Sequence, residues 1–324
     1  MTTAVTQIEL MPEEASQIRS LLAEIRSDQR LLNQHSFLEE ATVFAQEMPK
    51  RIRQAFYRFK REEQAPVLLV RDNPVLAEGP GPTPSGYPEM EPGYELNDLQ
   101  LLQGLYGSLL GEAIGFTSQR QGSVYNNIIP RREHEVMGNS SAGSRLAFGF
   151  HTEDAFHPSR PDYISLACMR NVERVTTTIS CVDGVALTDE ERDALFQPRF
   201  RIAHNPIHAT SGVVNEEAQA ILFGCSDKPY VRINTTLLKL EDYGGLERRA
   251  LEKLLDHFVA NRISITLRAR DCVFIDNYRC VHAREAFKAR YGPSARWLSR
   301  VVFTNDLRKS RTLRQSQFSR AIAA

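Results

Sequence analysis

Apolar positions recur at helical spacing in the first third of the chain and in short, strand-like runs afterwards. Residues 12–27 open with a proline and two glutamates and then carry apolar residues three and four apart, which predicts an amphipathic helix. Ser36 and Glu39 have the spacing of a capping box for a second helix, which bends or restarts at Pro49. Residues 65–72 form a continuous apolar run followed by turn residues, which predicts a buried strand.

A segment rich in proline and glycine, residues 79–94, follows that strand. It is interpreted either as a domain boundary or as a long loop inside one domain. The next pattern predicts a helix over residues 97–115, with Asn97 and Gln100 as its capping box.

Beyond residue 120 the chain consists mainly of short, β-rich segments separated by turns. Only residues 188–196 and 245–262 carry convincing helical patterns there. A helical N-terminal part that leads into mostly antiparallel strands favours an α+β fold with a closed or sandwiched β core.

Composition limits the class of protein further. Of the 324 residues, 42% are hydrophobic and 25% charged, which are values typical of globular proteins. The 40 basic and 40 acidic residues cancel, so neither nucleic acid nor an anionic membrane is indicated as a partner. The 5 cysteines form no CxxC pair, which favours a reduced, cytoplasmic protein over a zinc–cysteine site. No signal peptide and no membrane-spanning run is recognisable, and the oligomeric state stays open.

Candidate chemistry begins with the stretch FGFHTEDAFHP. We expect His151 and Glu153, two residues apart on or just before a strand, to point to the same face. His282, in FIDNYRCVHARE, is the best third ligand among the 8 histidines. Two histidines and one carboxylate on one face are typical of non-haem iron(II) oxygenases. A zinc hydrolase, or ordinary polar roles for these residues, stay open as alternatives.

Two arginines near the C-terminus strengthen this interpretation. Arg296 and Arg300 share a face of the strand predicted for RWLSRVVF. A buried arginine is costly unless it meets an anion, so two of them imply two carboxylates. A dicarboxylate cosubstrate and an amino-acid substrate would supply these carboxylates, whereas an internal salt bridge is the alternative for either arginine.

Three stretches, LAFGFHTEDAFHPSRPDYISLACMR, FIDNYRCVHAREAF and RYGPSARWLSRVVFTNDLRKSR, resemble the clavaminate synthase-like branch of the iron(II)/2-oxoglutarate dioxygenases, which includes free arginine, lysine and asparagine hydroxylases. The resemblance covers about residues 98–310. It implies an α+β fold with a double-stranded β-helix core (jelly-roll, cupin-like) and N-terminal and inserted helices. We therefore expect one dioxygenase domain over 1–324, made of a helical part at 1–64 and a core at 65–310, with a lid insertion at about 205–228.

The resemblance also implies roles for particular residues. The cofactors and cosubstrates would be Fe(II), 2-oxoglutarate and O₂. The iron ligands would be His151, Glu153 and His282; the 2-oxoglutarate contacts would be Arg296 and Thr178; the substrate contacts would be Arg300, Gln119, Ser141 and Glu153.

The sequence departs from the family pattern at Asn234 and Thr236, which stand where the family's arginine hydroxylases carry acidic residues. Neutral groups do not compensate the desolvation of a guanidinium, so a neutral or amide-bearing amino acid is favoured, and Arg120 leaves an acidic one open. The expected activity is hydroxylation of an unactivated C–H of a free L-amino acid or close derivative, in specialised metabolism. The alternatives are a desaturase that uses the same site and a non-catalytic cupin-like protein that binds a small acid.

Overall fold

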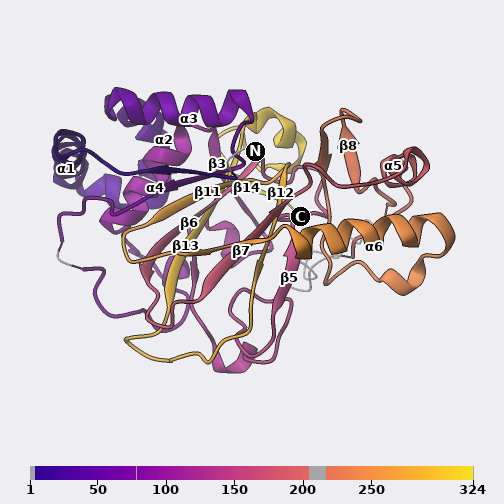
Figure 1. The fold of residues 1–324 in the computed structure, drawn as a ribbon. Helices are drawn as coiled ribbons and strands as arrows, with labels where there is room; N and C mark the ends of the chain where they lie inside the picture. Colours follow the sequence, from indigo (N-terminus) through magenta and orange to yellow (C-terminus); the bar gives the residue numbers. More distant parts are fainter. Residues whose placement is uncertain (1–3, 78, 204–216, 324) are drawn as a thin grey trace.

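Two β-sheets face each other, and helices cover the outer face of each sheet (Figure 1). The structure is a computed structural model, and it describes residues 4–77, 79–203 and 217–323. The larger sheet contains, in spatial order, β1 (Val5–Ile8), β2 (Val67–Val70), β11 (Cys272–Asp276), β6 (Tyr163–Arg170), β13 (Trp297–Thr304), β3 (Glu112–Phe116) and β14 (Ala321–Ile322), and β4 (Asn126–Ile128) also pairs with β13. The smaller sheet contains β10 (Ile263–Thr266), β7 (Thr176–Cys181), β12 (Cys280–Arg284) and β5 (Phe148–His151).

The remaining elements surround these sheets. Strands β8 (Leu222–Gly224) and β9 (Pro229–Val231) form a separate hairpin. The α-helices are α1 (Pro12–Ser27), α2 (Gln34–Phe44), α3 (Lys50–Glu62), α4 (Asp98–Ser108), α5 (Asp189–Phe196) and α6 (Gly245–Ala260). The arrangement is the α+β fold with a jelly-roll core that the sequence predicted.

Strand β2 shows why its sequence is apolar without alternation. It lies between β1 and β11, and its two faces contact different hydrophobic clusters. Leu68 and Val70 face the N-terminal helices, whereas Val67 and Leu69 face the space between the sheets. A strand buried on both faces needs apolar residues at every position, which explains the continuous run.

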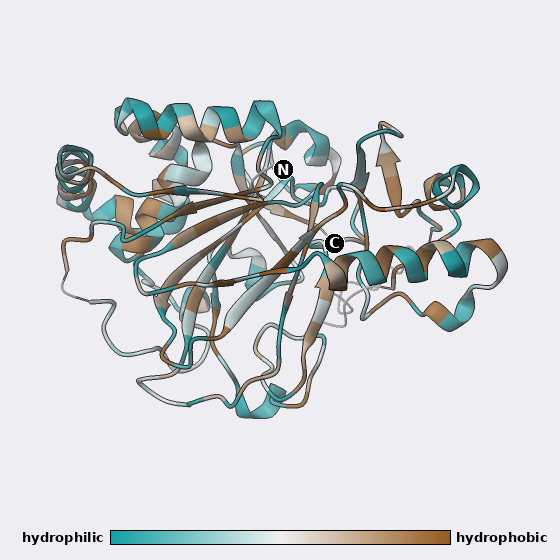
Figure 2. Cartoon of the chain, viewed as in Figure 1, coloured by the Kyte–Doolittle hydropathy of each residue, from teal (hydrophilic) through white to brown (hydrophobic). Residues whose placement is uncertain are grey.

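The helices bury one face each. Helices α1–α4 pack on the larger sheet, where the ring of Phe56 lies 5.3 Å from that of Tyr106 and 5.0 Å from that of Phe274. Helices α5 and α6 cover the smaller sheet, with Leu254 and Phe258 of α6 in the same cluster as Val281 of β12. Figure 2 shows the hydrophobic residues concentrated on the strands and hydrophilic residues on the outward faces of the helices. In the described residues, no helix combines the length and apolarity needed to cross a membrane.

The predicted helix boundaries were partly wrong. Helix α2 begins at Gln34, because the Asn33 side chain caps it by accepting a hydrogen bond from the His35 N–H, and Ser36 is not its cap. The helix predicted over 97–115 ends at Ser108, because residues 112–116 form strand β3 instead. Pairing with β13 and β14 outweighs the local helical pattern there.

Other boundaries agree with the predictions. Helix α1 covers residues 12–27, and α3 restarts the chain directly after Pro49. Asn97 and Gln100 form the predicted capping box of α4. The part expected to be purely helical, residues 1–64, also contributes the edge strand β1.

The proline- and glycine-rich segment 79–94 packs against the strands that follow it. The Thr83 hydroxyl donates a hydrogen bond to the Ala295 carbonyl at 2.7 Å, and Glu89 accepts two hydrogen bonds from Asn127. The segment therefore forms part of the wall around one end of the barrel. That the whole chain forms a single domain stays a prediction.

Close packing between α4 and β13 predicts the effect of one small substitution. A Cβ atom at Gly107 would overlap the ring of Phe303, which is completely buried. We expect Gly107→Ala to lower the free energy of unfolding by about 1–3 kcal/mol, because overpacking outweighs alanine's better helix propensity. Denaturant unfolding measures the change, and Gly79→Ala, where a Cβ meets nothing within 4 Å, is the control. A stabilised Gly107→Ala protein would contradict this packing.

Candidate metal centre and adjoining cavities

Three side chains that could bind a metal converge at the mouth of the barrel. His151 is the last residue of β5, and His282 lies in the middle of β12. The two strands pair in a register that places His282 opposite His151, with ring centroids 4.1 Å apart. One ligand atom each from His151, Glu153 and His282 lie within 4.8 Å of one another. The two residues were expected on or just before a strand; strand β5 ends at His151, and Glu153 reaches the site from the following turn.

The side chain of Asn277 fixes that turn, and no sequence pattern pointed to this residue. Asn277 lies in the turn between β11 and β12 and is completely buried. Its side-chain oxygen accepts a hydrogen bond from the Glu153 N–H at 2.7 Å, and its amide donates to the Glu153 carbonyl at 3.1 Å. The turn that leads into the strand of His282 therefore also holds the backbone of Glu153.

The electrostatics of the three side chains suit a divalent metal. Burial, together with the nearby His282, lowers the pKa of His151 to about 3, so the imidazole is neutral. Its Nδ1 lies 2.8 Å from the Gly149 carbonyl, which leaves Nε2 as the ligand atom. Burial raises the pKa of Glu153, but the charge of Arg300 and the contact with His282 outweigh it, so the carboxylate is ionised. Two imidazoles and one carboxylate are the donor set of non-haem iron(II), so these residues fit that ion.

A small cavity of about 60 Å³ adjoins the three side chains inside the barrel. Arg296, Leu298 and Arg300 all line it, so alternation along the start of β13 is as the sequence indicated. Arg296 is 4% exposed, and its Nε has no hydrogen-bond partner in the described chain. Burial lowers the pKa of Arg296 to about 10, which still leaves it charged. A buried cation that forms no ion pair among the described residues indicates a binding site for an anion, although the charge of Glu173 also acts on it.

The structure places Thr177, and not the expected Thr178, in the lining of this cavity. Thr177 shares its face of β7 with Ile179, which packs in the barrel interior, so Thr178 points to the opposite face. Three consecutive threonines do not indicate which of them face the barrel interior. This explains why the sequence pointed to Thr178 and not to Thr177. Arg284 also lines the cavity and was not singled out from the sequence. Its position two residues after His282 on one strand was the available signal.

A larger cavity of about 290 Å³ adjoins His151 and Glu153. Arg300 bridges two of its walls, donating hydrogen bonds to Glu153 and to the Gln119 side-chain oxygen at 2.6 Å. Ser141 lines both cavities, and Asn234 lines the larger one. Thr236 does not line it in the part of the chain that is described; it is exposed, and its hydroxyl donates to Asn234.

Further polar residues line the larger cavity, and of these only Arg120 was singled out from the sequence. Arg120, which left an acidic substrate open, lies over the ring of Tyr87 and 3.5 Å from a carboxylate oxygen of Glu89, so its charge already has a partner. Further polar residues of the lining are Asn126, Asn127, His134, Asn139 and Ser140. Half of the lid expected at about 205–228, residues 205–216, lies outside the described residues, which end at 203 and resume at 217.

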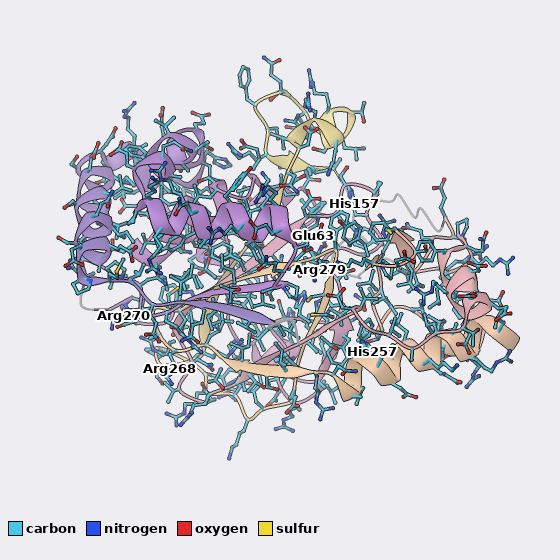
Figure 3. All side chains as sticks on the ribbon, turned by 45° about the horizontal axis from the view of Figure 1, so that its top comes forward. Glu63, His157, His257, Arg268, Arg270 and Arg279 are labelled. Carbon is cyan, nitrogen blue, oxygen red and sulfur yellow. The ribbon has the colours of Figure 1, made fainter. Side chains whose placement is uncertain are left out.

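Two other histidines have partners away from this centre. His157 Nε2 lies 3.1 Å from the Ala323 carbonyl, and His257 Nε2 lies 3.1 Å from the Cys181 carbonyl. Figure 3 labels both residues, His257 on helix α6. A ring nitrogen of each histidine therefore contacts a backbone carbonyl and not the metal centre.

A jelly-roll barrel with two histidines and one carboxylate at its mouth, beside a buried arginine, defines a non-haem iron oxygenase that uses a 2-oxo acid. Residues 96–302 match the family model described as taurine catabolism dioxygenase TauD, TfdA family. The chain belongs to this family of dioxygenases.

Individual relatives extend the similarity over nearly the whole chain. Enduracididine beta-hydroxylase of Streptomyces hygroscopicus is 32% identical over 97% of this chain and 99% of its own length. L-asparagine oxygenase of Streptomyces coelicolor is 33% identical over 82% of this chain and 79% of its own. The crystal structure of the non-heme iron oxygenase OrfP with Fe and alpha-ketoglutaric acid superposes with a TM-score of 0.85, at 31% identity, covering 98% of this chain and 100% of that one. The protein is thus an iron(II)- and 2-oxoglutarate-dependent dioxygenase.

The geometry of the metal site predicts what happens when Glu153, the carboxylate among its three candidate ligands, is replaced. Glu153→Gln keeps the shape of the side chain but removes its charge, so we expect Co(II) to bind at least about 100-fold more weakly, because loss of even an outer-shell partner costs 10–100-fold. Calorimetric titration of the metal-free protein with Co(II) measures this change. Glu13→Gln, on the exposed face of α1, is the control and should bind Co(II) as the unaltered protein does. Unchanged affinity in Glu153→Gln would exclude Glu153 as a ligand.

Proposed function

We propose that the protein hydroxylates an unactivated C–H of a free L-amino acid whose side chain ends in a neutral hydrogen-bond acceptor, with a carboxamide as the best fit. Relatives are named as an L-ornithine/L-arginine 3-hydroxylase, an L-lysine 3-hydroxylase and an L-asparagine oxygenase. The nature of the side chain is inferred from the walls of the larger cavity.

Asn234 is the observation that carries this proposal. Its side-chain oxygen accepts hydrogen bonds from the Thr236 N–H at 3.0 Å and the Thr236 hydroxyl at 2.7 Å. Because an N–H donates only, these contacts fix which end of the amide is oxygen. The Nδ2 group makes no hydrogen bond within the described chain and is left to donate into the cavity. A donor at this position favours a carbonyl oxygen and disfavours an ammonium or guanidinium group.

The carboxylates of the cavity support the same conclusion. Among the described residues, only Glu153 and Asp154 contribute carboxylates to the lining. Glu153 contacts Arg300 and His282, and Asp154 accepts a hydrogen bond from the Gln119 amide at 3.4 Å. Both carboxylates therefore already have hydrogen-bond partners, so a cationic substrate side chain would have to displace one of these contacts to gain a counterion.

The residues divide the work of binding. His151, Glu153 and His282 would hold the iron, which with 2-oxoglutarate and O₂ supplies the oxidising power for C–H hydroxylation. Arg296 would bind the distal carboxylate of 2-oxoglutarate, and Thr177 is better placed than Thr178 to assist it.

On the substrate side, Arg300 would bind the substrate carboxylate, since its guanidinium lies between Gln119 and the metal ligands. Gln119, Ser141 and the outer oxygen of Glu153 would orient the amino acid. Phe148 and Phe156 of the lining would exclude water from the reacting carbon. Thr236 would act through Asn234 and not by direct contact.

The alternatives are less well supported. A desaturase would use the same residues, but the relatives described above are named as a hydroxylase and an oxygenase. A non-catalytic binding protein would not need two imidazoles and a carboxylate next to an anion site. We further propose that the enzyme acts in the cytoplasm as one domain closed by a lid at about 205–228.

Turnover tests the proposal directly. The purified protein with Fe(II), ascorbate and 2-oxoglutarate is incubated with single free amino acids, and succinate and the mass of the amino acid are measured. Asparagine or glutamine should gain one oxygen with matching succinate formation. Loss of two hydrogens would identify a desaturase, and preference for arginine or lysine would refute the role given to Asn234.

The two arginines should affect different reactants. We expect Arg296→Lys to raise the KM for 2-oxoglutarate about 10-fold or more and to change the KM for the amino acid little, because the fork of donors to one carboxylate is lost. Arg300→Lys should do the reverse. Steady-state kinetics with each reactant varied in turn separates the two effects. Parallel changes in both KM values would contradict separate carboxylate sites.

Asn234→Asp should change the preference of the enzyme among amino acids. A carboxylate at this position repels a carbonyl oxygen and attracts a cation, so kcat/KM for the amide substrate should fall about 10-fold or more while ornithine or lysine gains activity. Competition between the two substrates, read by mass spectrometry, measures the ratio. Asn261→Asp, exposed at the end of α6, is the control and should leave the ratio unchanged.

A further inference from the structure

Arg284 lies in the small cavity beside Arg296, on the same strand as His282. It is 7% exposed, and its Nε, like that of Arg296, has no hydrogen-bond partner in the described chain. The two guanidinium groups lie 5.2 Å and 5.9 Å from the centre of the Phe287 ring. On β12, the metal-ligand candidate His282 and the anion-attracting Arg284 therefore share one face. Arg296, directly before β13, lines the same cavity.

The charges around this cavity do not balance. Its described lining contains Arg284, Arg296 and Arg300 but only one carboxylate, Glu153, which already contacts Arg300. Neither Arg284 nor Arg296 forms an ion pair among the described residues, and the charge of Glu173 acts on Arg296 from outside the lining. Two buried guanidinium groups in this state are costly, and an anion placed between them lowers that cost. A dicarboxylate brings the charge that the cavity lacks.

The two Nη atoms of Arg284 donate hydrogen bonds to backbone carbonyls outside the cavity. Nη1 donates to the Glu285 carbonyl at 3.0 Å and, at 3.5 Å, to that of Ser144; Nη2 donates to the Leu146 carbonyl at 3.2 Å. The Phe287 N–H also donates to the Ser144 carbonyl, at 2.8 Å. Residues 144–146 connect Ser141, which lines both cavities, to strand β5.

We propose that Arg284 is a positioning residue that transmits binding of the 2-oxo acid to the wall of the substrate cavity. Its Nε–H donates to the carboxylate that Arg296 binds, while its Nη atoms hold the segment of residues 144–146. Binding of the cosubstrate then fixes the guanidinium and orders the segment next to Ser141, so that the substrate cavity is completed after the cosubstrate has bound. This inference rests on the proposed function only in taking 2-oxoglutarate as the ligand of Arg296.

The test uses the full-length protein loaded with Mn(II) and kept free of oxygen, so that no turnover occurs. Calorimetry measures 2-oxoglutarate binding to the unaltered protein, Arg284→Gln and Arg284→Lys. Loss of a charge-assisted hydrogen bond should weaken binding by Arg284→Gln about 10-fold or more. Arg145→Gln removes an exposed arginine of the same segment that pairs with Glu135, and it should bind 2-oxoglutarate normally.

Amide hydrogen exchange distinguishes positioning from simple charge attraction. In the unaltered protein, 2-oxoglutarate should slow exchange in residues 140–147, and it should fail to do so in Arg284→Gln at saturating 2-oxoglutarate. Arg284→Lys keeps the charge but not the fork of donors, so it should retain the melting temperature and most of the affinity while losing the protection. It carries the test if Arg284→Gln does not fold.

Two results would overturn the inference: unchanged 2-oxoglutarate affinity in both Arg284 variants, or full protection of residues 140–147 in the lysine variant. Failure of the unaltered protein to bind 2-oxoglutarate would instead overturn the proposed function, together with the inference that rests on it.

Discussion

The pairing of β12 with β5 is the constraint on which the site depends. It places His282 opposite His151, and the turn that precedes β12 fixes Glu153 through the two hydrogen bonds of Asn277. Because side chains alternate along a strand, a slip of one residue would turn His282 out of the barrel. The register of these two strands therefore positions the two histidine ligands within the smaller sheet. Helices α5 and α6 cover the outer face of this sheet.

The interior around these ligands is unusual in its charge. Arginines converge on it from β12 and β13, while Glu153 is the one carboxylate that the described chain contributes to the smaller cavity. Such an arrangement costs stability in the absence of anions. It suits a reaction in which two carboxylate-bearing molecules meet, and binding of each would repay part of that cost. The larger cavity contrasts with it, since the Arg120 guanidinium faces Glu89, the Asp154 carboxylate accepts a hydrogen bond from Gln119, and Asn234 presents a neutral donor.

The sequence contained most of the chemistry but not its geometry. His151, Glu153, His282, Arg296 and Arg300 could be singled out because residue type and spacing carry the signal, and the structure brings these five together. Thr178 could not be separated from Thr177, because the phase of a strand made of three threonines depends on its neighbours. The Asn277 side chain acts on the backbone of Glu153, so it had no local pattern, whereas Arg284 had a signal in its position two residues after His282 on one strand. The end of α4 at Ser108 was likewise set by pairing of the following residues with β13 and β14.

A crystal structure of the protein grown without oxygen, with Fe(II) and 2-oxoglutarate and with data collected at the iron absorption edge, tests the central claim most directly. The account predicts one anomalous peak at about 2.0–2.2 Å from His151 Nε2, a Glu153 carboxylate oxygen and His282 Nε2, the usual range for such ligands. It also predicts 2-oxoglutarate on that ion with its far carboxylate at Arg296. Iron bound elsewhere, or a 2-oxo acid that does not reach Arg296, would contradict it.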